Sequence, residues 1–181
     1  MKLYHGSSVG GIIELLPALS NHGKEYAYLT NSRVLAILYA HNPIKSPGGF
    51  FTYRFNKDGK LLYDEYFPNQ TAVMYKGRKG YVYAVQAEDG EYQKLEKMPW
   101  VYLSEKAVKI DAVTEIDDLY EALLQEEAAG NLVINRHENM SEEEKSKWHA
   151  VVEKDVENRG LKSKEDGDYA AFIHEHFPEI I

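Results

Sequence analysis

The sequence predicts an α+β fold, with strands in the first part of the chain and helices in the last part. Short apolar and aromatic runs, separated by turn residues, continue to about residue 112. The pair Asp58-Gly59 lies between two alternating runs and is typical of a β-hairpin turn. From Thr114 onward, apolar residues recur at helical spacing. Strands followed by helices differ from the regular alternation of a parallel α/β sheet.

The first expected elements are two strands, at residues 2–5 and 25–29, and a helix. Each strand is an apolar and aromatic run that ends in polar groups. Asn31 and Ser32 are good N-caps for the helix that follows, and Asn42-Pro43 is expected to end it. Its apolar stripe consists of Val34, Leu35, Leu38 and Tyr39.

The middle of the chain reads as a hairpin followed by further strands. Residues 50–55 and 60–66 form the hairpin around Asp58-Gly59, and a short helix is expected at residues 71–75. The following strands are expected at residues 80–86, 100–103 and 107–112.

After residue 113 we expect three helices, which pack on the β core. Thr114 and Asp117 resemble a capping box, and Gly130 suits the end of the first helix. Its apolar stripe, which needs burial, consists of Ile116, Leu119, Tyr120, Leu123 and Leu124. The second helix begins at Ser141 with Glu144 and carries Trp148, which should be buried, and the third begins at Ser163 with Asp166. The predicted domains are therefore a β-rich core, residues 1–113, and a helical extension, residues 114–181.

Composition excludes several classes of function. The net charge of -8 argues against broad binding to nucleic acid or to anionic membranes. The chain has no cysteine, so disulfides and thiol nucleophiles are ruled out. No apolar run approaches the roughly 20 residues that span a bilayer, and we expect a cytoplasmic protein.

Known catalytic and ligand motifs are mostly missing. Residues 6–10 match G-x-S-x-G, but too little chain precedes Ser8 to build the oxyanion loop that such a nucleophile needs. Neither of the common glycine-rich phosphate-binding motifs occurs. His174 and His176 are two residues apart on an expected helix, so they diverge, and we predict no metal site.

The candidate site lies at the ends of the first two strands. The first run, Leu3-Tyr4-His5-Gly6-Ser7, ends near an imidazole, and the second, Tyr26-Ala27-Tyr28-Leu29-Thr30, ends in a phenol and a hydroxyl. We expect His5, Tyr28 and Thr30 to face one cleft, with His5 and Tyr28 on adjacent strands.

These two runs, with the apolar helix after them, resemble the N-terminal half of the ADP-ribosyltransferase fold. They are most similar to the small rifampin ADP-ribosyltransferase-like group. The likeness extends over residues 2–112, with gaps, and includes the runs at residues 81–86 and 100–110. It implies a split antiparallel β core and NAD as substrate, with ADP-ribose passed to an unidentified acceptor.

The resemblance also implies roles for individual residues. His5 would bond ribose hydroxyls and Tyr28 would stack on nicotinamide. Gly6, Ser7 and Thr30 would complete the NAD-binding set, with Ser7 or Thr30 bonding the carboxamide or a ribose. A carboxylate aimed at the ribose should stabilise the positive charge that develops there.

The position of this carboxylate leaves alternatives open. Glu96 is the best match to the family's acid and Glu91 the second, while Glu105 follows the strand and is expected to be structural. If no acid is in place, the chain would be a catalytically inactive relative that binds a nucleotide or a protein partner. A further alternative is an RNA 2'-phosphotransferase-like enzyme on the same fold, which would need several arginines around a phosphate.

Overall fold

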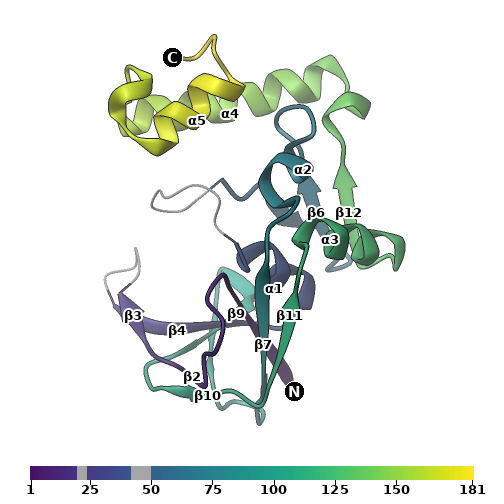
Figure 1. Cartoon of the computed structure of the whole chain (residues 1–181), viewed down its shortest axis with the longest axis vertical. Helices are drawn as coiled ribbons and strands as arrows, with labels where there is room; N and C mark the ends of the chain where they lie inside the picture. The colour runs from purple at the N-terminus through teal and green to yellow at the C-terminus, as the bar shows by residue number, and fades with distance from the viewer. Residues whose placement is uncertain (20–23, 42–49) are drawn as a thin grey trace. The chain divides into compact units, whose positions relative to one another are not determined.

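Two units, each formed by two separate stretches of chain, make up this α+β structure. The computed structural model describes residues 1–19, 24–41 and 50–181, so the helix end expected at Asn42-Pro43 lies outside the described residues. One unit contains Met1–His41 and Tyr75–Ala128, and the other contains Asn42–Met74 and Ala129–Ile181. The sheets are mainly antiparallel and helices end the chain, as predicted (Figure 1).

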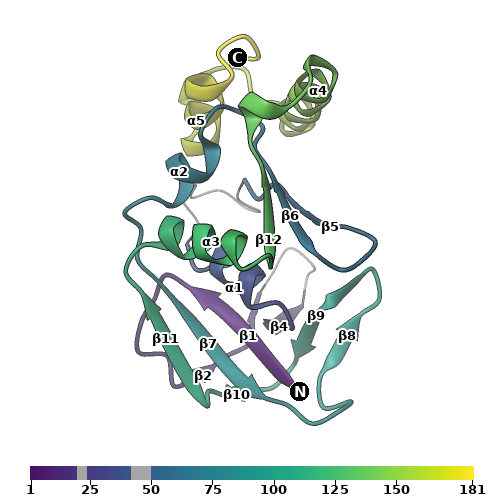
Figure 2. The same ribbon diagram turned by 90° about the vertical axis from the view of Figure 1, so that its right-hand side faces the viewer.

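The first unit is built on a seven-stranded sheet. Figure 2 shows β11, β7 and β1 side by side. The boundary that we expected after residue 113 lies inside β11. In order across the sheet the strands are β11 (Ala112–Ile116), β7 (Gly80–Gln86), β1 (Lys2–Ser7), β4 (Glu25–Thr30), β9 (Met98–Ser104) and β8 (Gln93–Leu95), with β3 (Ala18–Leu19) beside β4.

The two neighbours of β1 are paired to very different extents. Between β1 and β7 the antiparallel ladder runs from Lys2↔Gln86 to Ser7↔Tyr81. Between β1 and β4 the ladder pairs Tyr4 with Thr30 and does not continue toward Ser7. The sheet therefore opens between β1 and β4 directly beyond Tyr4, which is where His5 lies.

Helices cover one face of this sheet and a two-stranded ribbon the other. Helix α1 (Arg33–Tyr39) begins at Ser32, whose side chain accepts a hydrogen bond from the backbone of Leu35, and residues 34–38 are buried. The ribbon pairs β2 (Glu14–Leu15) with β10 (Val108–Lys109). Its buried side chains join one hydrophobic cluster with β1, β4, β7 and β9: Leu3, Leu15, Ala27, Leu29, Val85, Ala87, Tyr102 and Val108.

The helix expected from Thr114 is wrong in its first turn. Residues 112–116 form β11, which pairs along the free edge of β7 with Thr114 opposite Val82. Helix α3 (Leu119–Ala128) begins later, because the Asp118 carboxylate accepts hydrogen bonds from the backbone N–H groups of its first turn. Likewise, the strand expected at residues 107–112 forms only the two-residue β10, and Ala112 already belongs to β11. Leu119 and Leu123 of α3 are fully buried, as the stripe required.

The second unit contains a mixed three-stranded sheet in the order β12-β6-β5. The β5–β6 hairpin forms as predicted, and β12 lies parallel to β6. The strands are β5 (Tyr53–Phe55), β6 (Leu61–Asp64) and β12 (Leu132–Asn135), and the helices are α2 (Gln70–Tyr75), η1 (His137–Asn139), α4 (Glu142–Arg159), η2 (Lys164–Asp166) and α5 (Asp168–His176).

The C-terminal helices begin where the sequence indicated. Ser141 and Glu144 form the predicted capping box of α4, which ends at Gly160 with a φ of 66°. The box of Ser163 and Asp166 caps the short η2, and α5 follows. Trp148 is half-buried rather than buried, and it stacks on Tyr66 with 4.6 Å between ring centroids.

Candidate functional site

His5 lies at the opening between β1 and β4 and is bonded to the backbone across it. Its ring nitrogen Nδ1 is 2.9 Å from the carbonyl oxygen of Tyr28. A carbonyl oxygen can only accept, so Nδ1 donates and carries the hydrogen. In the neutral ring, Nε2 is then a hydrogen-bond acceptor. The predicted placement of His5 and Tyr28 on adjacent strands is confirmed.

The neutral form of His5 is favoured by its surroundings. Burial lowers the pKa of His5, and the hydrogen bond to the Tyr28 carbonyl only partly opposes this shift. Because the ordinary pKa of histidine is already near 6.5, the ring is neutral at pH 7. His5 therefore presents an acceptor at Nε2 and is not a fixed cation.

Glycine at position 6 is required by the packing of α1 against β1. A Cβ atom at this position would overlap the backbone oxygen of Ala36 and come within 2.7 Å of the backbone nitrogen of Ala40. Ala36 lies in the middle of α1 and Ala40 is the C-cap of this helix, so the missing side chain lets α1 approach β1 closely. Its expected role in binding NAD stays a prediction.

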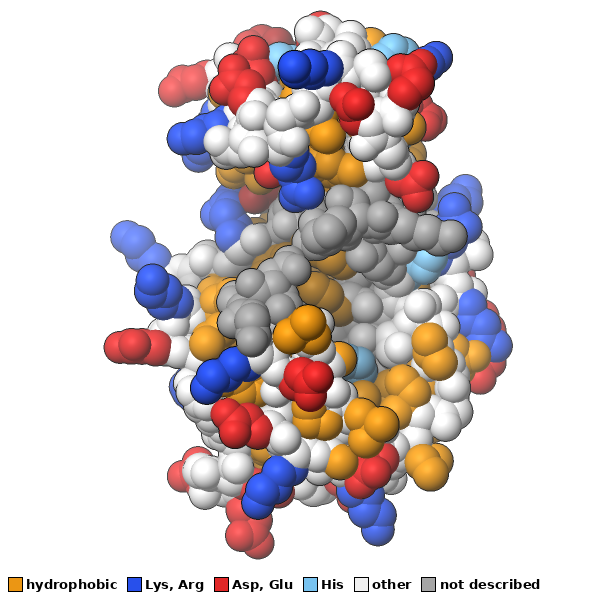
Figure 3. Space-filling model, turned by 90° about the vertical axis from the view of Figure 1, so that its left-hand side faces the viewer, with side chains coloured by type: hydrophobic (Ala, Val, Ile, Leu, Met, Phe, Trp, Pro, Cys, Tyr) orange, Lys and Arg blue, Asp and Glu red, His pale blue; other side chains and the backbone are white. Residues whose placement is uncertain are grey.

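Ser7 and the segment after it border the same end of β1. The Ser7 hydroxyl accepts a hydrogen bond from the backbone of Val9. Tyr83, which pairs with His5 in the ladder, donates its hydroxyl to the carbonyl of Val9 and accepts from the backbone of Ile12. Figure 3 shows hydrophobic side chains on the surface of this unit, and Ile13 of this segment is 84% exposed. The segment is therefore held by its backbone, while some of its apolar side chains stay exposed.

The expectation that His5, Tyr28 and Thr30 face one cleft is wrong, because His5 lies on one face of the sheet and Tyr28 and Thr30 lie on the other. Partners in an antiparallel ladder share a face, and successive residues alternate between faces. Because Tyr4 pairs with Thr30, the side chains of Thr30 and Tyr28 lie on the face of Tyr4, and His5 lies on the other. The Thr30 hydroxyl instead accepts a hydrogen bond from the backbone of Ser32 before α1.

The three candidate acids are all exposed. Glu96 lies in the two-residue turn between β8 and β9, and Glu105 lies in the bend after β9. Glu91 accepts a hydrogen bond from the backbone of Glu88, which closes the turn after β7. In this arrangement Glu91 has a structural role, and Glu96 is a free carboxylate at a hairpin tip.

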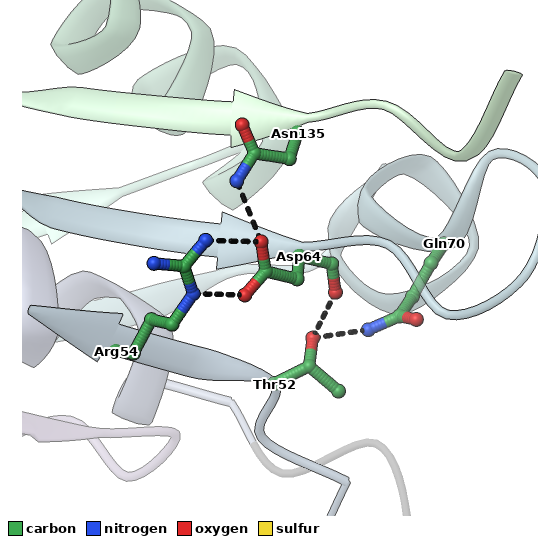
Figure 4. Close-up of polar contacts among 5 residues, drawn as sticks. All are labelled: Thr52, Arg54, Asp64, Gln70 and Asn135. Atoms are coloured by element: carbon green, nitrogen blue, oxygen red, sulfur yellow. Dashed lines mark hydrogen bonds and ion pairs between the residues drawn. The ribbon is translucent and has the colours of Figure 1, made fainter. Parts of the chain in front are cut away.

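A buried polar network in the second unit was not predicted from the sequence. Asp64, at the end of β6, is 3% exposed and accepts hydrogen bonds from both Arg54 and Asn135 (Figure 4). Thr52 donates its hydroxyl to the backbone oxygen of Asp64 and accepts from Gln70. The only sequence signal was an acidic pair, Asp64-Glu65, in an otherwise apolar strand.

Glu65 is buried beside this network and is also satisfied. It is 1% exposed and accepts from both the backbone and the hydroxyl of Thr71, and from the backbone of His137. Buried carboxylates persist only when donors replace water. Asp64 and Glu65 therefore tie together β5, β6, β12 and α2, and their oxygens are already used.

The described residues contain neither a metal-binding cluster nor a membrane-spanning helix. Across residues 1–19, 24–41 and 50–181, no three His, Asp or Glu side chains are grouped so as to hold a metal ion. None of the described helices has the length and apolar character needed to cross a membrane.

Comparisons of the chain with protein-family models, with curated proteins and with solved structures each give no match. The case for a function therefore rests on the residues and their geometry.

Proposed function

We propose that the first unit binds NAD at the end of β1 and transfers ADP-ribose to an acceptor. In this reaction the bond between nicotinamide and ribose C1' breaks, and its electron pair neutralises the pyridinium nitrogen. The acceptor nucleophile forms the new bond to C1' and loses its proton. The resemblance of the two strand ends to ADP-ribosyltransferases motivates the proposal. The side chains of His5 and Tyr28, on opposite faces of the sheet, depart from the arrangement that this resemblance implies, so the proposal depends on His5 alone.

The hydrogen bond from His5 to the Tyr28 carbonyl is the observation that carries this proposal. It fixes the orientation of the imidazole and leaves Nε2 as an acceptor. A ribose hydroxyl is a suitable donor for that nitrogen. Since the ring is held before the substrate arrives, little ordering is needed on binding. His5 is thus a positioning group for the ribose, and the role of Ser7 stays a prediction. Tyr28 and Thr30 lie on the opposite face of the sheet and are not part of this proposed site.

A second candidate is a relative that binds NAD without turning it over. It is favoured by the exposed position of Glu96 on the β8–β9 turn. A carboxylate in water stabilises a developing cation much less than one in a water-excluded site. Turnover would then require this turn to bring Glu96 to the ribose.

Calorimetry with NAD, combined with an assay of nicotinamide release, tests both candidates. His5→Asn is the sharpest variant, because its amide can still donate to the Tyr28 carbonyl but the acceptor at Nε2 is lost. We expect this variant to weaken NAD binding by about tenfold, because the ribose hydroxyl loses one hydrogen-bond acceptor. The matched control is His174→Asn on the exposed side of α5, which should bind NAD as the unmodified chain does.

The second variant separates binding from chemistry. Glu96→Gln should leave NAD binding intact and reduce nicotinamide release, whereas Glu105→Gln should change neither. Binding without release in the unmodified chain would favour the inactive relative. If NAD does not bind at millimolar concentration, both candidates are rejected.

A further inference from the structure

The second unit contains a cavity of about 290 Å³ that is separate from the His5 site. It opens beyond the carboxyl ends of β6 and β12, which run parallel and end at the paired residues Asp64 and Asn135. Phe67 follows β6 and His137 follows β12, and both line the cavity. The carboxyl ends of neighbouring parallel strands are a common place for ligands in α/β sheets.

One wall of the cavity is apolar and well packed. Phe67 and Phe177 are 3% and 4% exposed and lie edge to face, with 5.8 Å between ring centroids. His176 stacks on Phe67 at 4.1 Å. Because these rings are held by one another, the wall keeps its shape without a ligand. Its rigidity suits an apolar body of a few carbon atoms.

The cavity is also lined by hydrogen-bond donors. Lys145 and Ser146 on α4 line it together with His137. Lys145 forms an ion pair with Glu142, whose side chain is 89% exposed. Such an exposed pair is worth less than about 1 kcal/mol, so the Lys145 ammonium is available to a ligand. The ring nitrogens of His137 have no hydrogen-bond partner among the described residues.

The acidic groups at this cavity are already paired. Glu142 pairs with Lys145, and Glu179 accepts a hydrogen bond from His149 at 2.7 Å. Glu65 does not line the cavity, and it is saturated by Thr71 and by the backbone of His137. When Lys145 turns to a ligand, the Glu142 carboxylate loses its partner, but its side chain is 89% exposed and water can solvate it. The groups available to a ligand are therefore the imidazole of His137 and the Lys145 ammonium.

We propose that this cavity binds a small organic carboxylate with an apolar body. The carboxylate would lie between Lys145 and His137, with Ser146 as a third donor, and the body would lie against Phe67 and Phe177. The volume is at the small end of the about 300–1,000 Å³ of ligand sites, which limits the ligand to roughly the size of one aromatic ring.

His137 is surrounded by charges of both signs. Burial lowers the pKa of His137 and the positive charge of Lys145 lowers it further, while the carboxylates of Glu65, Glu138 and Glu142 act in the opposite direction. Two groups that disfavour each other's charge are thus placed side by side. An anion between them would offset that repulsion.

Benzoate is the probe for this proposal, with benzylamine as its counterpart of opposite charge. We expect benzoate to bind the full chain with a millimolar Kd and to shift the backbone NMR signals of His137, Lys145 and Phe177. Benzylamine should bind more weakly. Lys145→Met keeps an apolar stem but removes the charge, and it should weaken benzoate binding by about tenfold.

The control variant is Lys154→Met, which removes the same charge from an exposed position on the same helix. It should leave the Kd for benzoate unchanged. The proposal is overturned if benzylamine binds as tightly as benzoate, if the two lysine variants behave alike, or if the shifted signals map elsewhere. Circular dichroism melts show whether each variant is folded.

Discussion

The His5 site and the Asp64 network hold polar groups in opposite ways. Asp64 and Glu65 are almost fully buried, and the surrounding Arg54, Asn135 and Thr71 supply their hydrogen bonds. His5 is half-buried and uses one nitrogen for the Tyr28 carbonyl. A saturated network stabilises a fold but offers nothing to a ligand. A group that is fixed on one side and open on the other is suited to binding.

The largest effect on stability is expected in the first unit, from Gly6→Ala. The new methyl group would overlap the backbone of Ala36, which cannot move without displacing α1. We expect a loss of about 3 kcal/mol in the free energy of unfolding, at the upper end for overpacking. Urea denaturation measures it.

Ser8→Ala is the control for this prediction, because Ser8 is exposed two residues away. Its effect should stay within about 0.5 kcal/mol. If Gly6→Ala were equally mild, the close approach of α1 to β1 would be wrong, and Gly6 would be free for a role in the site.

In the second unit the largest effect should come from Glu65→Ala. The substitution leaves the backbone N–H and hydroxyl of Thr71 without their acceptor in a buried environment. We expect a loss of about 2–3 kcal/mol, again from urea denaturation. Glu138→Ala, at an exposed position in η1, should have almost no effect. Equal effects would show that Glu65 is hydrated in solution.

One helix cap in each unit allows the effect of cap loss to be compared, because the two cap hydrogen bonds have the same length. Ser32 accepts from Leu35, and Ser141 accepts from Glu144, both at 3.2 Å. Alanine at a cap costs about 0.5–2 kcal/mol. We expect Ser32→Ala to lie in the upper half of this range, because α1 is short and buried, and Ser141→Ala in the lower half. Thermal melts of both variants test the order, and the reverse order would contradict the assigned difference in burial.

The smallest effect is a loss of stability at acid pH, shared by both units. Burial lowers the pKa of His5 and of His176, so the unfolded chain binds protons more readily than the folded one. Stability is therefore complete above about pH 6.5 and falls as the pH decreases toward the folded-state values. Melting temperatures across this window should show the fall.

His176→Phe tests the share of the second unit in this pH dependence. The phenyl ring can keep the stack on Phe67 but cannot be protonated, so the melting temperature should fall less on acidification. His174→Phe, at an exposed position of α5, should leave the fall unchanged. A fall that is identical in the two variants would exclude His176 as a source.

Much of the local structure could be predicted from the sequence, because the deciding contacts lie within a few residues. The run at residues 80–86 forms β7 as predicted, and Ser141 with Glu144 caps α4. The adjacency of His5 and Tyr28 was also predictable, since consecutive strands often pair. In each case the contacts that determine the structure are indicated by a short stretch of sequence.

Tertiary structure decided which side chains meet. The register of Tyr4 with Thr30 places Tyr28 on the face opposite His5. A shift of one residue in that register would put both side chains on the same face, and the sequence alone does not determine the register. The edge of β7 turns residues 112–116 into a strand despite their helical spacing. Asp64 meets Asn135 across 71 residues only because β6 and β12 lie side by side. Long-range pairing, absent from any local window, determines all three.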